Sequence, residues 1–202
     1  TIFNACWPMY AAMPAVLKDA IERSYQKVGW DLRNSESEKG VFPTFFDLLD
    51  ILPGVIEESH YSKDTQSDYV GALCTRVKSL TNGIYGSVLC AEDALSDAEM
   101  FDQNVIVDLS RVGSMETKSL LMGILVMKLQ EYRMCSSGMN SRLRHVTVLE
   151  EAHNLLRKTS AEQSQEGANL QGKSVEMLAN AIAEMRTYGE GFIIADQAPG
   201  LL

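Results

Sequence analysis

Two adjacent glutamates, Glu150 and Glu151, directly follow the short apolar run at residues 146–149. A buried strand of an open α/β sheet delivers such side chains to its carboxyl end, where the ligands of these sheets bind. In nucleotide hydrolases the first carboxylate orients Mg²⁺ or its water shell, and the second positions the attacking water. The same pattern is also typical of acidic residues that only favour the positive start of a following helix.

Glu150 and two residues near the glutamates can be interpreted further. At the first acidic position of nucleotide hydrolases aspartate is commoner, and the extra methylene of Glu150 favours indirect contact with a metal. Asp108 ends an apolar run and could approach the same site, but its type is also that of a turn residue. We interpret His153 as a histidine of a helix surface or of the core and not as a ligand.

The elements that would position these residues lie after about residue 100. Residues 104–109 (NVIVDL), His145–Glu150 (HVTVLE) and residues 191–195 (GFIIA) are apolar, rich in β-branched residues and typical of buried parallel strands. Ser114 can cap a helix that runs to about Arg133, and an amphipathic helix precedes residue 191. Strands alternating with helices predict an α/β fold with a parallel sheet of three strands.

Residues 1–100 are expected to be mainly helical. A first helix begins near Pro14 and ends at Gly29, a second covers residues 45–52 and ends at Pro53, and a third covers residues 67–80. Residues 34–40 are predicted to form a loop. The chain therefore divides into a helical subdomain, residues 1–100, and an α/β part, residues 101–202.

Composition restricts the class of protein. The 202 residues carry a net charge of −9, which does not indicate a broad nucleic-acid surface. The four cysteines are scattered, so we expect a reducing, cytoplasmic environment without disulfides. The longest apolar run is too short to span a bilayer, so no membrane segment is expected. The chain is expected to begin and end inside a larger protein.

Several segments together resemble the HerA/FtsK branch of the P-loop ATPases, closest to the HerA-like translocases and conjugation ATPases. The resemblance covers almost the whole chain and is carried by PMYAAMPAVLKDAIERSYQKVGWDL, NVIVDLSRVGSMETKSLLMGILVMKLQEYR, EEAHNLL and EMRTYGEGFIIADQAP. It implies that residues 1–100 are a helical insertion and residues 101–202 the C-terminal part of a RecA-like core.

The resemblance also implies roles for individual residues. Glu150 and Glu151 match the Walker B motif, with Glu150 on the Mg²⁺ side and Glu151 as the catalytic carboxylate. Gln197 matches the sensor residue that contacts the γ-phosphate or the attacking water; its plain alternative is a loop residue bonded to the backbone. Arg186 matches an arginine that reaches a neighbouring subunit's nucleotide, and guanidinium suits phosphate because it is always charged. Its plain alternative is a solvated cation at a helix end.

Residues 167–174 (GANLQGKS) formally satisfy the Walker A pattern G-x-x-x-x-G-K-[ST]. A genuine phosphate loop follows a strand, whereas the residues before this stretch are polar and acidic. In the resembled family the loop also precedes the acidic motif. We therefore interpret the match as a coincidence and expect the phosphate loop to lie upstream of Thr1. The isolated chain should then bind nucleotide weakly or not at all and hydrolyse none.

These observations predict part of an ATP-hydrolysing, Mg²⁺-dependent motor. The resemblance implies a ring, a hexamer, that translocates or processes DNA with a nuclease or other effector as partner. One alternative is a non-catalytic helical interaction module on a degenerate ATPase fold. Another takes residues 167–174 at face value and makes the chain a self-sufficient small NTPase.

Overall fold

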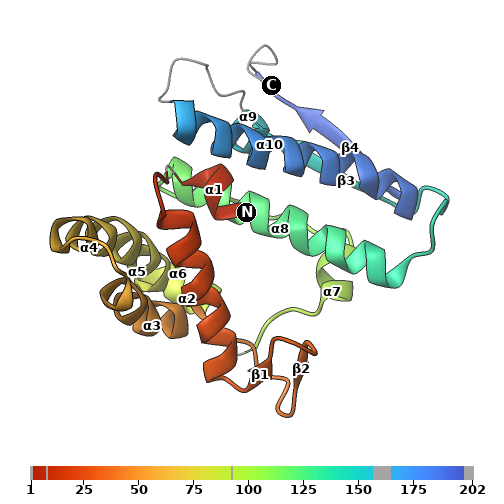
Figure 1. Cartoon of the computed structure of the whole chain (residues 1–202). Coiled ribbons are helices and arrows are strands. Elements are labelled where there is room, and N and C mark those ends of the chain that lie inside the picture. The colour runs from red at the N-terminus through yellow and green to blue at the C-terminus, as the bar shows by residue number, and fades with distance from the viewer. Residues whose placement is uncertain (1, 8, 92, 157–164, 198–202) are drawn as a thin grey trace. The chain divides into compact units, whose positions relative to one another are not determined.

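The computed structural model describes residues 2–7, 9–91, 93–156 and 165–197; for Asn154 and residues 165–174 only the backbone is described. The chain forms two compact units (Figure 1). The helical unit comprises Tyr10–Ala94, and the sheet unit comprises Thr1–Met9 and Leu95–Leu202. The helical unit is thus an insertion in the chain of the sheet unit, which is where the first nine residues belong.

The helical unit begins with α2 (Met13–Lys27), which has Pro14 in its first turn. Proline is tolerated there because the first N–H groups of a helix have no partner within the helix. The helix buries Val16, Leu17 and Ala20 and packs against α3. Gly29 follows with φ of 97°, a conformation that favours glycine, so the helix ends as predicted.

Helix α3 (Phe45–Glu58) starts at a capping box in which the backbone N–H of Thr44 donates to Asp47 at 2.9 Å. The prediction that Pro53 ends this helix was wrong, because the helix continues through it. Proline removes one backbone hydrogen bond. The buried side chains Val55 and Ile56 lie beyond it, and their burial favours continuing the helix over ending it.

The predicted third helix is longer than expected. It runs through α4 (Lys63–Tyr69), the π-helical turn η1 (Val70–Cys74) and α5 (Thr75–Thr81), and α6 (Gly83–Leu89) follows. Buried side chains of these helices add to the core of the helical unit: Tyr69, Leu73, Val77 and Leu80. The predicted loop at residues 34–40 contains one strand of a short antiparallel hairpin, β1 (Trp30–Asp31) and β2 (Glu36–Ser37).

The sheet unit is built around α8 (Met115–Ser136). The Ser114 hydroxyl caps this helix by accepting the N–H of Thr117 at 3.3 Å, as predicted. Helix α1 (Ile2–Cys6) packs against both α8 and α10 (Gln165–Met185), and α7 (Asp97–Phe101) packs against α8 (Figure 1). The buried face of α8 includes Leu120, Val126 and Leu129.

Two parallel strands form the sheet: β3 (His145–Glu150) and β4 (Glu190–Ala195), in register from His145↔Glu190 to Glu150↔Ala195. Between them the chain passes through α9 (His153–Leu156), α10 and η2 (Arg186–Tyr188). Gly189 turns the chain into β4 with φ of 83°, and a Cβ there would lie 2.5 Å from the Arg142 carbonyl oxygen. Both strands lie where the sequence predicted them.

The prediction of a third strand at residues 104–109 was wrong. This stretch has no strand structure, and Val105, Ile106 and Val107 are exposed, Ile106 to 95%. A strand is stabilised by a neighbour's backbone and by cross-strand packing, and β-branched composition specifies neither. Within the described residues the fold is therefore α/β with many helices and a parallel sheet of two strands.

Candidate active site

The parallel pairing of β3 and β4 brings the predicted site residues to one edge of the sheet. Glu150, the last residue of β3, is in register with Ala195, the last residue of β4. Glu151 follows Glu150, and Gln197 follows Ala195 after one intervening residue. All three of these polar side chains are exposed, so this carboxyl edge offers two carboxylates and an amide to a ligand.

Glu151 has an unusual backbone conformation, with φ of 51°. Residues other than glycine rarely adopt this left-handed conformation, and they need surrounding interactions to hold it. Its N–H donates to the Ala195 carbonyl oxygen at 2.9 Å, which ties the turn after β3 to the end of β4. The Glu151 carboxylate lies 3.5 Å from the Nζ of Lys118, a residue in the first turn of α8.

Asp108 lies in the turn that precedes α8. Hydrogen bonds from the hydroxyl and the backbone N–H of Ser110 hold the pKa of Asp108 below its ordinary value, and the Lys118 charge lowers it further. Asp108 is therefore a turn residue, as its plain interpretation has it. Its carboxylate nevertheless lies within the electrostatic reach of Lys118, the residue that pairs with Glu151.

Asp196 is a residue of this edge that was not predicted from the sequence. Its side chain is only 2% exposed. Its carboxylate accepts the backbone N–H of His153 at 2.8 Å and lies 2.9 Å from the His153 Nδ1. The sequence could have indicated Asp196, because this aspartate directly follows a predicted strand and precedes the predicted sensor residue Gln197. His153 is half-buried and paired, and the structure places it next to the site.

Arg186 is not brought to the carboxyl edge. It is exposed and begins η2, before the first residue of β4, whereas Gln197 follows the last. A six-residue strand spans roughly 20 Å, so the two residues belong to opposite ends of the sheet. Within this chain, Arg186 therefore cannot act on a ligand held by Glu150 and Glu151.

The Walker A match at residues 167–174 lies inside α10, which the structure describes from Gln165 onward. A phosphate loop binds by wrapping its backbone N–H groups around the phosphates before the helix begins. In a continuous helix those groups are hydrogen-bonded to carbonyl groups one turn earlier, except in the first turn. The backbone at residues 167–174 is therefore not that of a phosphate loop.

The carboxyl edge can be tested for its fit to a magnesium nucleotide. No cluster of three or more histidine, cysteine or acidic residues that could hold a metal occurs in the described part of the chain. Mg²⁺ in nucleotide sites typically takes only one or two carboxylates and completes its shell with water and phosphate oxygens. Glu150 and Glu151, exposed and adjacent, fit that partial role.

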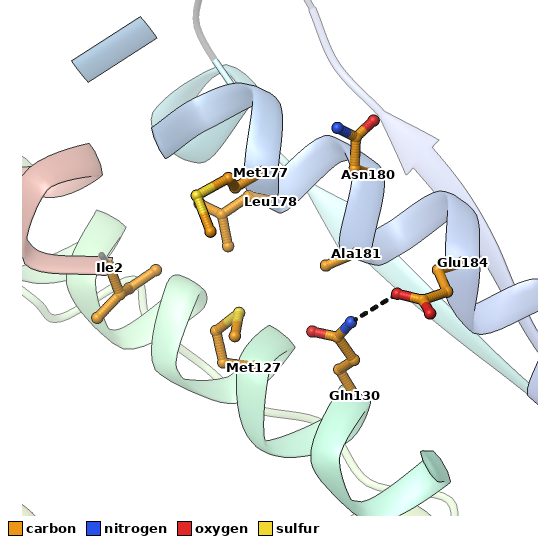
Figure 2. A pocket seen from close by; sticks show the side chains of 8 residues that line it. All are labelled: Ile2, Met127, Gln130, Met177, Leu178, Asn180, Ala181 and Glu184. Atoms are coloured by element: carbon orange, nitrogen blue, oxygen red, sulfur yellow. Dashed lines mark hydrogen bonds between the residues drawn. The ribbon is translucent and has the colours of Figure 1, made fainter. Parts of the chain in front are cut away.

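A cavity of about 270 Å³ lies between α8 and α10, with Ile2 of α1 also lining it. Figure 2 shows Met127 of α8 facing Met177 and Leu178 of α10, with a hydrogen bond of 3.1 Å from Gln130 to Glu184 beside them. None of the predicted site residues lines this cavity. The candidate site is therefore separate from this cavity, on an edge of the sheet where Glu150, Glu151 and Gln197 are exposed.

Further properties of the chain come from the structure and from comparison with known proteins. All four cysteines are free thiols in the structure. Within the described ranges, no helix combines the length and the apolarity that crossing a bilayer requires. Searches against models of protein families, curated proteins and solved structures found no match to this chain.

Proposed function

We propose that this chain provides the acidic and sensor residues of an ATP-hydrolysing motor of the HerA/FtsK type, on part of a RecA-like core. The observation that supports this most is the parallel pairing of β3 with β4. It brings Glu150 and Glu151 beside Gln197 at the carboxyl edge, where open α/β sheets bind ligands. The helical crossover between the two strands is the connection that such a core requires.

Each residue then has a chemical task. Glu150 would hold the water shell of Mg²⁺, and Glu151 would orient the attacking water. Gln197 donates its amide hydrogens to that water or to the γ-phosphate. Bound Mg²⁺ would neutralise charge that develops on the phosphate oxygens. The phosphates themselves would be held by a loop upstream of Thr1, since residues 167–174 have the backbone of a helix.

The position of Arg186 suits a role between subunits better than a role within one. It is exposed and lies at the end of the sheet opposite Glu151. In a ring, a hexamer in our proposal, this arginine would reach the nucleotide of a neighbouring subunit.

The net charge of −9 favours DNA contact through a local loop or the ring's pore over a broad surface. A nuclease or other effector would supply further chemistry, and the cytoplasm is the proposed location.

Substitution of Glu151 in the full-length parent protein tests this proposal. Glu151→Gln removes the charge that orients water while keeping the shape, so we expect ATP turnover to fall at least about 100-fold. Glu131→Gln is the matched control, because Glu131 is an exposed glutamate of α8 near its far end. Unchanged turnover in Glu151→Gln would contradict the catalytic role.

One observation favours the alternative of a non-catalytic interaction module on a degenerate ATPase fold. The only Walker A match in the sequence lies inside α10, so it offers no phosphate cradle. The alternative predicts equal turnover for Glu151→Gln and the unsubstituted parent.

The self-sufficient NTPase has a separate test in the 202-residue chain. Loss of ATP binding in Lys173→Ala would support it, and an unchanged, weak affinity supports the coincidence.

A further inference from the structure

The buried carboxylate of Asp196 has its partners on the turn that carries Glu151. Burying a charged group is costly unless it is paired and hydrogen-bonded. At 2% exposure, Asp196 meets this requirement through His153, which offers its backbone N–H at 2.8 Å and its ring Nδ1 at 2.9 Å. The hydrogen bond to the backbone also satisfies an N–H at the start of α9, which has no acceptor within the helix.

Two hydrogen bonds to the end of β4 bracket the backbone of Glu151. On one side, Glu151 donates its own N–H to the Ala195 carbonyl oxygen at 2.9 Å. On the other side, His153 donates to Asp196. Between them, Ala152 is completely buried and anchors the turn in the core. These contacts hold Glu151 at its positive φ of 51°, which an unsupported glutamate rarely adopts.

We infer that Asp196 and His153 form a positioning pair that fixes the direction of the Glu151 carboxylate and couples it to Gln197. Asp196 directly precedes Gln197, so a shift of Gln197 on contact with a γ-phosphate moves the acceptor of the His153 bond. That bond transmits the shift to the turn holding Glu151. The inference rests on the proposed ATPase function and assigns the pair no direct contact with substrate.

A second histidine–carboxylate pair, at the opposite edge of the sheet, provides a control. His145 begins β3, and its Nδ1 lies 2.8 Å from the buried carboxylate of Glu190, which begins β4. This pair also joins an imidazole to a buried carboxylate, but it lies at the amino edge, a full strand length from Glu151, and Glu190 has Arg133 and Thr147 as further partners. A purely structural effect of losing such a contact should also appear at the amino edge, whereas positioning of Glu151 should appear only at the carboxyl edge.

The kinetic test compares three variants of the full-length parent at a temperature where circular dichroism shows each to be folded. We expect Asp196→Ala to lower kcat at least about tenfold with less than about a twofold change in KM, because the hydrogen bonds that this variant removes position a catalytic group. Asp196→Asn keeps an oxygen that accepts the His153 N–H and should retain kcat within about threefold. His145→Gln should keep kcat unchanged.

The outcomes separate this inference from the proposed function. If Glu151→Gln abolishes turnover but Asp196→Ala retains the parent kcat, the positioning pair is wrong and the ATPase assignment stands. If Glu151→Gln has no effect, the proposed function itself fails. If His145→Gln lowers kcat as much as Asp196→Ala does, the effect is structural and the inference is overturned.

Nitrogen NMR of the 202-residue chain tests the pairing without any activity. The His153 ring should carry a proton on Nδ1, directed at Asp196, and Asp196→Asn should change the shifts of both ring nitrogens. A His153 ring with a bare Nδ1 and a proton only on Nε2 would overturn the pairing. Because this measurement uses the unsubstituted chain, it decides whether His153 and Asp196 are paired even if Asp196→Ala does not fold.

Discussion

The Arg133 guanidinium donates from Nε to the Glu190 carboxylate at 2.8 Å, and the Glu190 side chain is completely buried. This contact joins the end of α8 to the first residue of β4. The second oxygen of Glu190 lies 2.8 Å from the His145 Nδ1 and 2.7 Å from the Thr147 hydroxyl, which donates to it. The amino edge of the sheet is thus closed by a hydrogen-bonded network, whereas the carboxyl edge exposes its glutamates.

Breaking this contact should be strongly destabilising. Glu190→Ala removes one of the two carboxylate partners of the buried Arg133, since Asp102 remains, so we expect a loss of about 3 kcal/mol in the free energy of unfolding by urea. Lys128→Ala is the control, because Lys128 pairs with Asp97 at 3.1 Å on the surface, where such pairs contribute at most about 1 kcal/mol. Equal losses in the two variants would contradict this account of the amino edge.

The stability of the sheet unit should depend on pH through Asp102. The Tyr132 hydroxyl and the Arg133 guanidinium hold the pKa of the Asp102 carboxyl below its ordinary value. A lowered pKa in the folded state contributes stability above the unfolded pKa of about 3.9, and this is lost as pH falls through the folded value. The stability difference between the natural chain and Asp102→Asn should therefore be full at pH 6 and shrink below about pH 4. Denaturation at several pH values measures it, and a difference independent of pH would refute this origin.

The positive φ of Glu151 predicts an unusual response to glycine. Glycine adopts this conformation without strain, so Glu151→Gly should be more stable than Glu151→Ala by roughly 1 kcal/mol. Glu150, in β3, should show the opposite order, because glycine weakens a strand. Thermal unfolding of the four variants measures both differences. A Glu151→Ala variant at least as stable as Glu151→Gly would show that the turn does not hold Glu151 at positive φ in solution.

The cysteines should differ in reactivity according to burial. Burial raises the pKa of the Cys6 thiol to about 12, whereas Cys135 at the end of α8 is exposed. Because the thiolate is the reactive form, iodoacetamide at pH 8 should modify Cys135 first and Cys6 only after unfolding in urea. Peptide mass spectrometry over time measures the two rates. Rapid modification of Cys6 in the folded chain would mean that α1 does not stay packed on α8 and α10.

Much of the fold could be predicted because it depends on neighbours in the sequence. The Ser114 cap, the end of α2 at Gly29 and the two strands all follow from local patterns of polar, apolar and glycine residues. The arrival of Glu150 and Glu151 at a strand end beside Gln197 was also predictable. The carboxyl ends of parallel strands meet at one edge, so two correct strands suffice to place these residues.

Other features depended on residues far apart in the chain. Residues 104–109 have the composition of a strand but no paired neighbour, and α3 continues through Pro53 because of its buried face. Nothing local distinguishes Glu190, which is buried, from an exposed glutamate, and its partners Arg133 and His145 lie more than 40 residues away.

The sequence by itself determined the Ser114 cap, the end of α2 at Gly29, the strands β3 and β4 and the polar residues that follow them, because propensity, capping and periodicity act over a few residues. Only the tertiary structure decided which carboxylates are buried and paired. It placed Asp196 in a hydrogen bond with His153, next to the turn of Glu151, and it placed Arg186 at the opposite end of the sheet. Burial and hydrogen-bond pairing are properties of surfaces that meet only after the chain has folded.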